Sequence, residues 1–319
     1  MVLLNSRLSV TLDWYNTKTT DLILLRSLPT SSGNDGTFAT YTNIGSTRNR
    51  GWELTVGSRN IVGRTFQWNS TLSLSSNRER ILDLVDGTDI QIGTSKESGT
   101  LMIGHPIKSY KTFKRQGIWT TAEAAVAATY FKDANKTRPF QPGDIKVADL
   151  DGDQVIDINK DITYIGSQTP KWFAGFNNDF RYKDFDLNIY LYARWGHWDE
   201  NPLADYSPST GGSYTTMGYW VAGSNEGGLF PALMQNRAFY DYVGYQSYWF
   251  CDHSFVRVKR IALGYTLPRR ALSALGSIQK LRVYATVNNP FCFVKDDMMK
   301  DFDPEGQQRS VTIGLNVNF

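Results

Sequence analysis

Hydrophobic and polar residues alternate along several stretches of the chain, and a period of two is typical of strands with one apolar and one polar face. The pattern predicts eight strands, over residues 8–14, 52–56, 66–74, 172–182, 185–195, 254–267, 281–287 and 311–319. The clearest example ends the chain, where one face carries Val311, Ile313, Leu315, Val317 and Phe319. In the sixth strand the apolar phase slips between Val258 and Ile261, which predicts a β-bulge or a strand end outside the buried zone.

The connections between these strands alternate in length. Short turns join the second strand to the third, the fourth to the fifth and the sixth to the seventh, whereas the other connections span residues 20–48, 80–170, 197–253 and 294–309. Loops longer than about 15 residues are uncommon in compact domains. A regular alternation of short and long connections is typical of a transmembrane barrel, whose tight turns share one side of the membrane. Thr120 and Glu123 form a capping-box pattern, which predicts one short helix in the longest loop.

Composition narrows the class of protein. The 319 residues include 17 Tyr, 17 Phe and 9 Trp beside 27 Gly, which favours strands and turns, and several aromatic residues fall near the predicted strand ends. No apolar stretch is long enough for a membrane-spanning helix, and residues 1–16 lack the apolar core of a signal peptide. The net charge is only +3 and no basic run occurs, so nucleic acid is not expected as a partner.

Two folds fit this pattern. An all-β, antiparallel transmembrane barrel would turn its apolar faces to outer-membrane lipid and its polar faces to a wet lumen, with every backbone group paired. A soluble antiparallel sandwich also alternates, and would suit an extracellular β-rich carbohydrate-binding or adhesion module. Long loops between strands with unbroken aliphatic rows favour the barrel.

A series of short motifs occurs in order along the chain. They are NIG at 43–45, NRGWEL at 49–54, GDIK at 143–146 running on to Asp157, YKDFDL at 182–187, SFVRVK at 254–259, LGYTLP at 263–268, LRVY at 281–284, NNPF at 288–291 and DPE at 303–305. Over essentially its whole length the chain resembles a SusC/RagA-type TonB-dependent outer-membrane transporter. That resemblance implies a barrel of 22 strands with long extracellular loops. Residues 1–319 would supply the last eight strands as the C-terminal portion, without the plug domain and the N-terminal strands.

The resemblance also implies a function and a set of partners. The function is import of oligosaccharides or peptides across the outer membrane of a Gram-negative bacterium, without a required cofactor. The partners are a SusD-like surface lipoprotein, TonB acting through a plug outside this chain, and the missing N-terminal barrel portion, since eight strands alone leave two unpaired edges. No enzyme is expected, because His105, His197 and His253 lie far apart and no P-loop or nucleophile elbow is present.

An acidic run is a candidate metal site. Asp149, Asp151 and Asp153 have the spacing of a calcium loop, to which the Val155 carbonyl and Asp157 could add ligands. Such an ion would have a structural role. Two residues depart from the pattern, because Gln154 stands where the loop prefers glycine and Lys160 stands where a bidentate glutamate would close the site. A solvated acidic loop with Asx turns is the alternative.

Two further groups are weaker candidates. Residues 198–249 are rich in aromatic and amide side chains, which suit stacking on sugar rings or contact with a partner, although self-packing of a large loop explains them equally well. The candidate ligand or partner residues are Tyr214, Tyr219, Trp220, Tyr240, Tyr242 and Trp249. Cys251 and Cys292 lie near the ends of two predicted neighbouring strands, so the sequence allows either a disulfide or two thiols.

Overall fold

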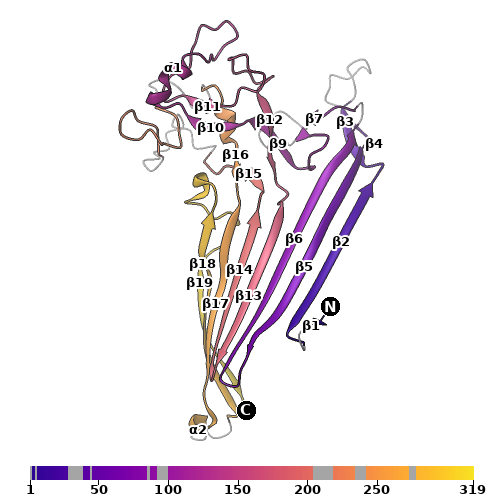
Figure 1. Ribbon diagram of the computed structural model, residues 1–319, viewed down its shortest axis with the longest axis vertical. Helices are drawn as coiled ribbons and strands as arrows, with labels where there is room; N and C mark the ends of the chain where they lie inside the picture. The colour runs from indigo at the N-terminus through magenta and orange to yellow at the C-terminus, as the bar shows by residue number, and fades with distance from the viewer. Residues whose placement is uncertain are drawn as a thin grey trace.

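The computed structural model places all eight predicted strands in one antiparallel sheet (Figure 1). It describes residues 2–3, 6–27, 39–43, 45–84, 87–91, 100–203, 218–233, 242–272 and 278–319. The strand order is β1-β2-β5-β6-β13-β14-β17-β18-β19, in which β1 (Val2–Leu3) is only a short edge piece. The long strands are β2 (Leu8–Thr19), β5 (Gly45–Val62), β6 (Phe66–Leu84), β13 (Trp172–Tyr182), β14 (Phe185–Trp195), β17 (Phe255–Thr266), β18 (Lys280–Val294) and β19 (Ser310–Asn318).

The predicted alternation of connections is confirmed. The turns at residues 63–65 and 183–184, and the described parts of the third turn at residues 267–272 and 278–279, lie at one end of the sheet (Figure 1). The third turn includes α2 (Arg269–Leu272), and the long connections leave from the other end of the sheet. The predicted bulge is confirmed as well. Lys259 is skipped in the pairing of β17 with both neighbours, since Val258 pairs with Leu191 and the next paired residue is Arg260. One extra residue in the strand shifts the phase of its side chains.

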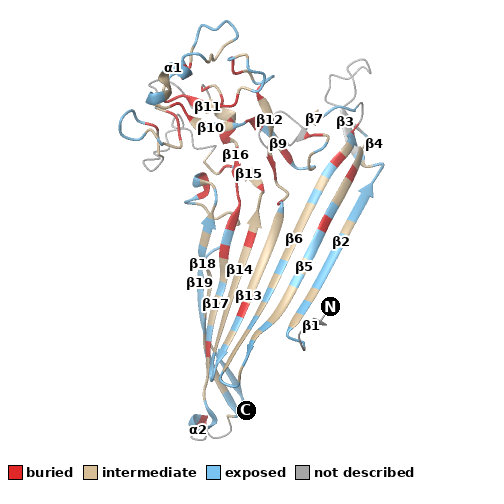
Figure 2. Cartoon of the chain, in the orientation of Figure 1, coloured by how far each residue is buried: buried red, intermediate tan, exposed pale blue. Residues whose placement is uncertain are grey.

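One face of the sheet is a continuous apolar surface. Register pairing aligns the apolar residues of successive strands, so that Leu263 of β17 faces Leu187 of β14 on one side and Ala285 of β18 on the other. No second layer covers the described part of this face: Ile313 is 76% exposed and Leu315 is 63% exposed. Figure 2 shows few buried positions along the strands. A soluble sheet would bury such rows, so their exposure indicates contact with lipid.

The sheet is open rather than closed. β19 lies at one end of the strand order and β1 and β2 lie at the other, and these edges do not pair with each other in the described residues. A closed wall in a bilayer needs every backbone group paired, so both edges require further strands. The structure is thus a segment of barrel wall, as expected from the sequence.

The long connections build a second region, which we call the loop assembly and define as residues 100–167, 196–203, 218–233, 242–254 and 295–309. The predicted helix is present as a 3₁₀ turn, Thr121–Glu123, leading into α1 (Ala124–Ala127), with the capping box formed. The small strands of the long connections are β3 (Ile23–Ser27), β4 (Ala39–Asn43), β7 (Ile90–Gln91), β8 (Thr100–Leu101), β9 (Ser109–Phe113), β10 (Arg115–Ile118), β11 (Ile145–Val147), β12 (Ile162–Ser167), β15 (Trp198–Glu200) and β16 (Phe250–Asp252).

A compact hydrophobic core holds the loop assembly together. Phe140, Ile145 and Tyr248 are at most 2% exposed and belong to one cluster with residues from four of its five segments. Two further 3₁₀ turns, Tyr245–Tyr248 and Asp297–Met299, add side chains to it. Across the described residues, helices are too short and too polar to cross a bilayer.

Candidate functional site

The face of the sheet opposite the apolar rows is polar and cross-linked by hydrogen bonds. Asn188 of β14 accepts from Arg260 Nε at 2.9 Å and donates to Asn177 Oδ1 at 2.8 Å. Arg282 of β18 reaches over Gly264 to donate to Asp186 Oδ1 at 2.9 Å. A Cβ at Gly264 would lie 2.3 Å from that guanidinium, so glycine leaves the room this ion pair needs. In a closed barrel this face would line the lumen.

A buried ion pair joins the sheet to the loop assembly. The side chain of Arg257, on β17, is 0% exposed and donates two parallel hydrogen bonds to Asp303, at 2.8 and 2.7 Å. The same carboxylate accepts from the backbone N–H groups of Glu305 and Gln307, at 2.9 and 3.0 Å. Bidentate geometry fixes both distance and orientation. Two of the sequence motifs, SFVRVK and DPE, therefore meet at this contact.

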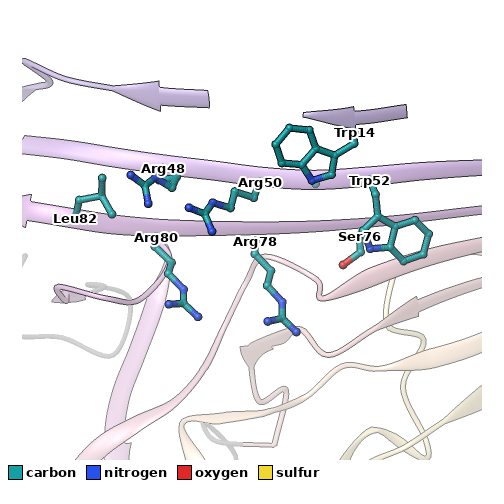
Figure 3. A pocket seen from close by; sticks show the side chains of 9 residues that line it. Trp14, Arg48, Arg50, Trp52, Ser76, Arg78, Arg80 and Leu82 are labelled. Carbon is teal, nitrogen blue, oxygen red and sulfur yellow. The ribbon is translucent and has the colours of Figure 1, made fainter. Parts of the chain in front are cut away.

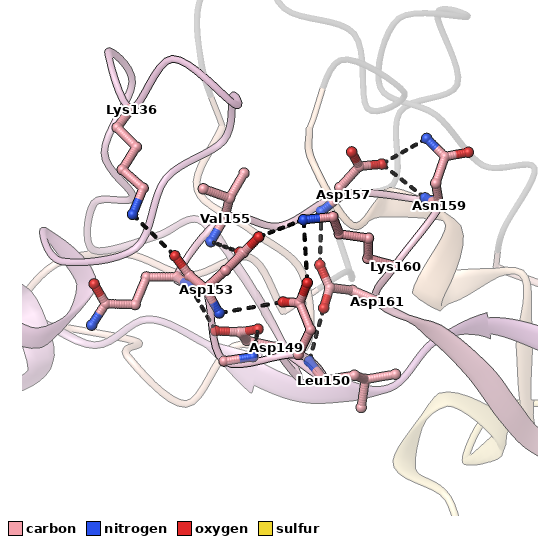
Figure 4. A network of polar contacts seen from close by, with 12 residues as sticks. Lys136, Asp149, Leu150, Asp153, Val155, Asp157, Asn159, Lys160 and Asp161 are labelled. Carbon is pink, nitrogen blue, oxygen red and sulfur yellow. Dashed lines mark hydrogen bonds and ion pairs between the residues drawn. The ribbon is translucent and has the colours of Figure 1, made fainter.

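The acidic run folds into a tight loop around its own carboxylates (Figure 4). Asp149 accepts from the backbone N–H groups of Gly152 and Gln154, at 2.8 and 2.9 Å. Gln154 has a φ of 65°, the left-handed conformation that calcium loops usually give to glycine at this position. Ligand oxygens of Asp149, Asp151 and Asp153 lie within 4.8 Å of one another. The structure thus brings together three of the five predicted ligands as a cluster.

The lysine that breaks the calcium pattern points into this cluster. Lys160 Nζ lies 2.7 Å from Asp153 Oδ2 and 3.2 Å from Asp151 Oδ2, where it neutralises two of the three carboxylates. The pKa of Asp153 lies below its ordinary value because Lys160 and the backbone N–H of Val155 donate to its carboxylate. The loop therefore has an internal cation at the place where a metal ion would bind.

The other two predicted ligands have different surroundings. The Asp157 carboxylate accepts from the backbone and side-chain amides of Asn159, at 2.8 and 2.9 Å, and lies outside the three-carboxylate cluster. Val155 is buried, and the isolated bridge that it forms with Phe131 anchors the loop. Asp161 instead ties the loop ends together, because its carboxylate accepts from the backbone N–H groups of Leu150 and Asp157, both at 2.8 Å.

The candidate aromatic residues do not form one exposed surface. Trp220 and Tyr242 are buried in the core of the loop assembly, which corrects their interpretation as ligand contacts and supports self-packing. Tyr219 and Trp249 are half-buried, and Trp249 contacts Tyr245 edge to face with ring centroids 6.0 Å apart. Tyr214 and Tyr240 lie outside the described residues. Composition alone does not distinguish an aromatic binding surface from an aromatic core.

The two cysteines are free thiols. Cys292 of β18 faces Arg257 of β17, whereas Cys251 lies in β16 and faces Asp199 of β15. Cys251 precedes Arg257, the residue opposite Cys292, by six positions. This spacing separates the thiols, because a strand rises about 3.3 Å per residue. The disulfide alternative is corrected accordingly. Burial raises the pKa of the Cys251 thiol, which makes it unreactive.

A buried polar cluster lies beside β15 and β16, and no local sequence pattern indicates it. The rings of His197 and His253 have centroids 6.0 Å apart, and His253 Nε2 lies 2.9 Å from the Glu200 carbonyl oxygen. Tyr110 stacks on Phe250 and donates to Asp199 at 3.1 Å. The histidines are 56 residues apart in sequence, and only the pairing of β15 with β16 brings them together.

Comparison with known proteins finds similar TonB-dependent receptors. No protein-family model matches the chain. TonB-dependent receptor P3 of Formosa agariphila is 31% identical over 330 residues, an alignment that covers 99% of this chain and 31% of that protein. TonB-dependent receptor SusC of Bacteroides thetaiotaomicron is 25% identical over 332 residues, covering 99% of this chain and 29% of that protein.

A solved structure of the RagAB peptide transporter has the same fold, with a TM-score of 0.69 at 22% identity, over 99% of this chain and 34% of that one. The chain therefore spans about a third of the length of the proteins it matches. Proteins of this class are receptors and transporters and not enzymes. Sequence and fold together identify this chain as SusC/RagA-type TonB-dependent transporter sequence, a protein of the Gram-negative outer membrane.

Proposed function

We propose that this chain contributes barrel wall and outer loops to an outer-membrane importer of oligosaccharides or peptides that is energised through TonB. The observation that carries the proposal is the two-sided sheet, whose apolar face is uncovered and whose polar face is hydrogen-bonded, in a chain related over 99% of its length to TonB-dependent receptors. In this proposal residues 1–319 form the C-terminal portion of the barrel. The plug and the remaining strands would lie outside them.

The loop assembly is the part that we propose to contact a SusD-like surface lipoprotein. It lies at the end of the sheet opposite the short turns, which corresponds to the extracellular end of a barrel (Figure 1). The luminal face suits both classes of cargo, because amides such as Asn177 and Asn188 pair equally well with peptide groups and with sugar hydroxyls. Peptides are what the RagAB transporter is named for.

Uptake by the native bacterium tests this proposal. Labelled oligosaccharide and peptide mixtures would be offered to cells with and without the gene, and to cells whose proton gradient is dissipated. We expect uptake of one class to require both the gene and the gradient. We also expect the protein in the outer-membrane fraction, extracted only by detergent and heat-modifiable on gels. A detergent-independent soluble protein would contradict the proposal and support the extracellular carbohydrate-binding or adhesion module.

We also propose that the acidic loop takes up Ca²⁺ as a structural ion in competition with Lys160. The three clustered carboxylates supply the hard oxygen ligands that calcium prefers, and the Val155 carbonyl would extend the set. The Lys160 ammonium already interacts with two of these carboxylates, so it lowers the affinity for a second cation. The ion would fix the loop without taking part in chemistry.

Replacing the competing lysine tests the calcium proposal. Lys160→Gln should strengthen Ca²⁺ binding roughly tenfold, because calcium affinity follows the net charge of the ligand set. Isothermal titration with CaCl₂ measures this effect. Lys136→Gln is the matched control, since Lys136 Nζ donates to the Asp153 carbonyl at 3.1 Å and lies over the Phe131 ring, so its loss frees no carboxylate of the cluster. The calcium site would be excluded if neither the wild type nor Lys160→Gln bound Ca²⁺. It would also be excluded if Asp153→Asn left Ca²⁺ binding unchanged.

A further inference from the structure

Four arginines line a groove on the apolar, outward-facing side of the sheet, where β5 and β6 extend towards the loop assembly (Figure 3). The groove has a volume of about 460 Å³ and is bounded at one end by two tryptophans, Trp14 and Trp52. The strand register places the arginines on the same face as the tryptophans. Trp52 pairs with Trp14, and Arg50 and Arg48 precede Trp52 on β5 by two and four residues, so their side chains point to the same side of the sheet. On β6 the corresponding residues are Arg78 and Arg80.

The two arginines of β5 lie directly opposite the two arginines of β6 in the strand register. Arg50 is the register partner of Arg78 and Arg48 is the register partner of Arg80. Like charges directly opposite each other on neighbouring strands are destabilising. Within the described residues no carboxylate lies within ion-pair distance of any of the four. Arg50 Nε donates to Asn16 at 3.2 Å, and the buried Nε of Arg48 has no hydrogen-bond partner.

Three acidic residues beside the groove lie on the other face of these strands. Asp13 pairs with Glu53, and Glu79 pairs with Asn49, all at positions one residue out of phase with the arginines. Lys18, the register partner of Arg48, adds a fifth cation to the outward face. Beside the groove, the strands thus carry cations on the outward face and these three acids on the luminal face. The counter-ion of the arginines must therefore come from outside the barrel.

The height of the groove indicates what that counter-ion is. Exposed tryptophans on the outward face of a barrel lie at the membrane–water interface, and Trp14 is 70% exposed. At about 3.3 Å per residue, Arg50 and Arg48 lie about 7 and 13 Å further along the strand than Trp52. Allowing for strand tilt, this is the level of lipid headgroups. The guanidinium fork matches phosphate oxygens in bidentate geometry.

We propose that this groove binds the phosphorylated headgroup of an outer-leaflet glycolipid, namely lipopolysaccharide. Arg48, Arg50, Arg78 and Arg80 hold the phosphates, while Trp14 and Trp52 contact the start of the acyl chains and the glycan. The bound lipid neutralises two pairs of facing arginines and fixes the depth of the barrel wall in the outer leaflet. This site lies outside the lumen, so it is independent of the cargo.

The test compares lipid retention by protein purified in mild detergent from outer membranes. The variant Arg48→Gln/Arg50→Gln/Arg78→Gln/Arg80→Gln should retain lipopolysaccharide about 100-fold more weakly than the wild type, measured by native mass spectrometry and by re-binding of purified lipopolysaccharide. The matched control Arg64→Gln/Lys183→Gln/Arg269→Gln/Lys280→Gln removes as many charges at the short-turn end of the sheet and should retain the lipid. The four corresponding lysine substitutions should give an intermediate result, because charge remains and the bidentate fork is lost.

Several outcomes would overturn the assignment. Equal lipid retention by wild type and the glutamine variant would do so, as would equal loss in the control. Competition by inorganic phosphate alone would assign the groove to a free anion. A change of oligomeric state with unchanged lipid retention would assign it to a contact between copies of the protein. If the fourfold variant fails to give a heat-modifiable barrel, the pair Arg78→Gln/Arg80→Gln is compared with Arg64→Gln/Lys183→Gln in the same assay.

Discussion

The sheet and the loop assembly differ in the exposure of their apolar side chains. In the loop assembly Phe140 is 2% exposed and Ile145 is 0% exposed, within a core that any soluble domain could have. In the sheet, Ile313 is 76% exposed although it belongs to a row of aliphatic residues that crosses the strands. The loop assembly supplies its own apolar environment, whereas the sheet needs one from outside. The two regions therefore fit two different surroundings: the loop assembly fits water, and the outward face of the sheet fits the hydrocarbon of a bilayer.

The largest effect is expected in the core of the loop assembly. Phe140→Ala should destabilise that region by about 3–5 kcal/mol, because it leaves a cavity among tightly packed aromatic residues. Limited proteolysis in detergent would show cleavage within the loop assembly while the heat-modifiable sheet persists. Val126→Ala is the control, since Val126 is exposed on α1. Joint loss of both regions would mean that they do not fold as separate units.

Charge on the outward face of the sheet should have the next largest effect. Ile313→Arg is expected to destabilise the barrel by about 2–4 kcal/mol, because the guanidinium would lie in hydrocarbon. Thr312→Arg, one residue away on the luminal face, should cost far less. Urea unfolding of the protein in lipid vesicles measures both. Similar costs for the two variants would contradict the assignment of the faces.

A smaller effect is expected at the contact between the two regions. Arg257→Lys keeps the charge but loses one of the two hydrogen bonds to Asp303, which should cost about 1–3 kcal/mol. The expected readout is faster proteolysis of residues 295–309 without change in the sheet. Lys259→Gln serves as the control, because Lys259 Nζ lies 3.8 Å from Glu305, too far for a hydrogen bond. Equal sensitivity of both variants would assign no special role to the bidentate pair.

The smallest effect is a dependence of loop-assembly stability on pH. Burial, followed by the charges of Arg194 and His253, lowers the pKa of His197 from 6.5 to about 4. The opposing neighbours are the carboxylates of Asp252 and Asp199. Because the folded state binds this proton more weakly than the unfolded state, the stabilisation is complete above pH 6.5 and is lost as pH falls towards 4.

Thermal unfolding of the loop assembly at several pH values across this window measures the effect. His197→Gln should flatten the dependence, whereas His105→Gln, which removes a ring that packs on Tyr164, should leave it unchanged. A slope that survives His197→Gln would assign the effect to other groups, of which His253 is the nearest, since burial lowers its pKa as well.

The strands could be predicted from the sequence because their signal is local. Alternation over a few residues reports on which side of a strand each side chain lies, and short turns report their own length. The bulge at Lys259 was visible for the same reason, since a single extra residue shifts the apolar phase. The arginine groove was missed because the predicted second strand, residues 52–56, begins too late. β5 begins at Gly45, so Arg48 and Arg50 belong to the strand and lie on the same face as Trp52.

The roles of the loop residues could not be predicted in this way, because they depend on partners outside the local sequence pattern. Trp220 and Tyr242 have the composition of a binding surface and are buried in a core instead. Lys160 was recognised as a departure from a calcium loop, but its position between two carboxylates depends on the turn at Gln154. Cys251 and Cys292 looked close in sequence register and are separated by the pairing of Cys251 with Asp199 in another sheet.

By itself, the sequence determined the number of long strands, the side of each strand that is apolar, and the order of short and long connections, since each is specified by residues near one another in the chain. Only the tertiary structure decided which loop aromatics are buried, which carboxylates gather around Lys160, and that four arginines of two strands meet on the outward face. Those contacts join residues that are from seven to many tens of positions apart. The distances between them are set by the pairing of strands and the packing of loops rather than by any local pattern.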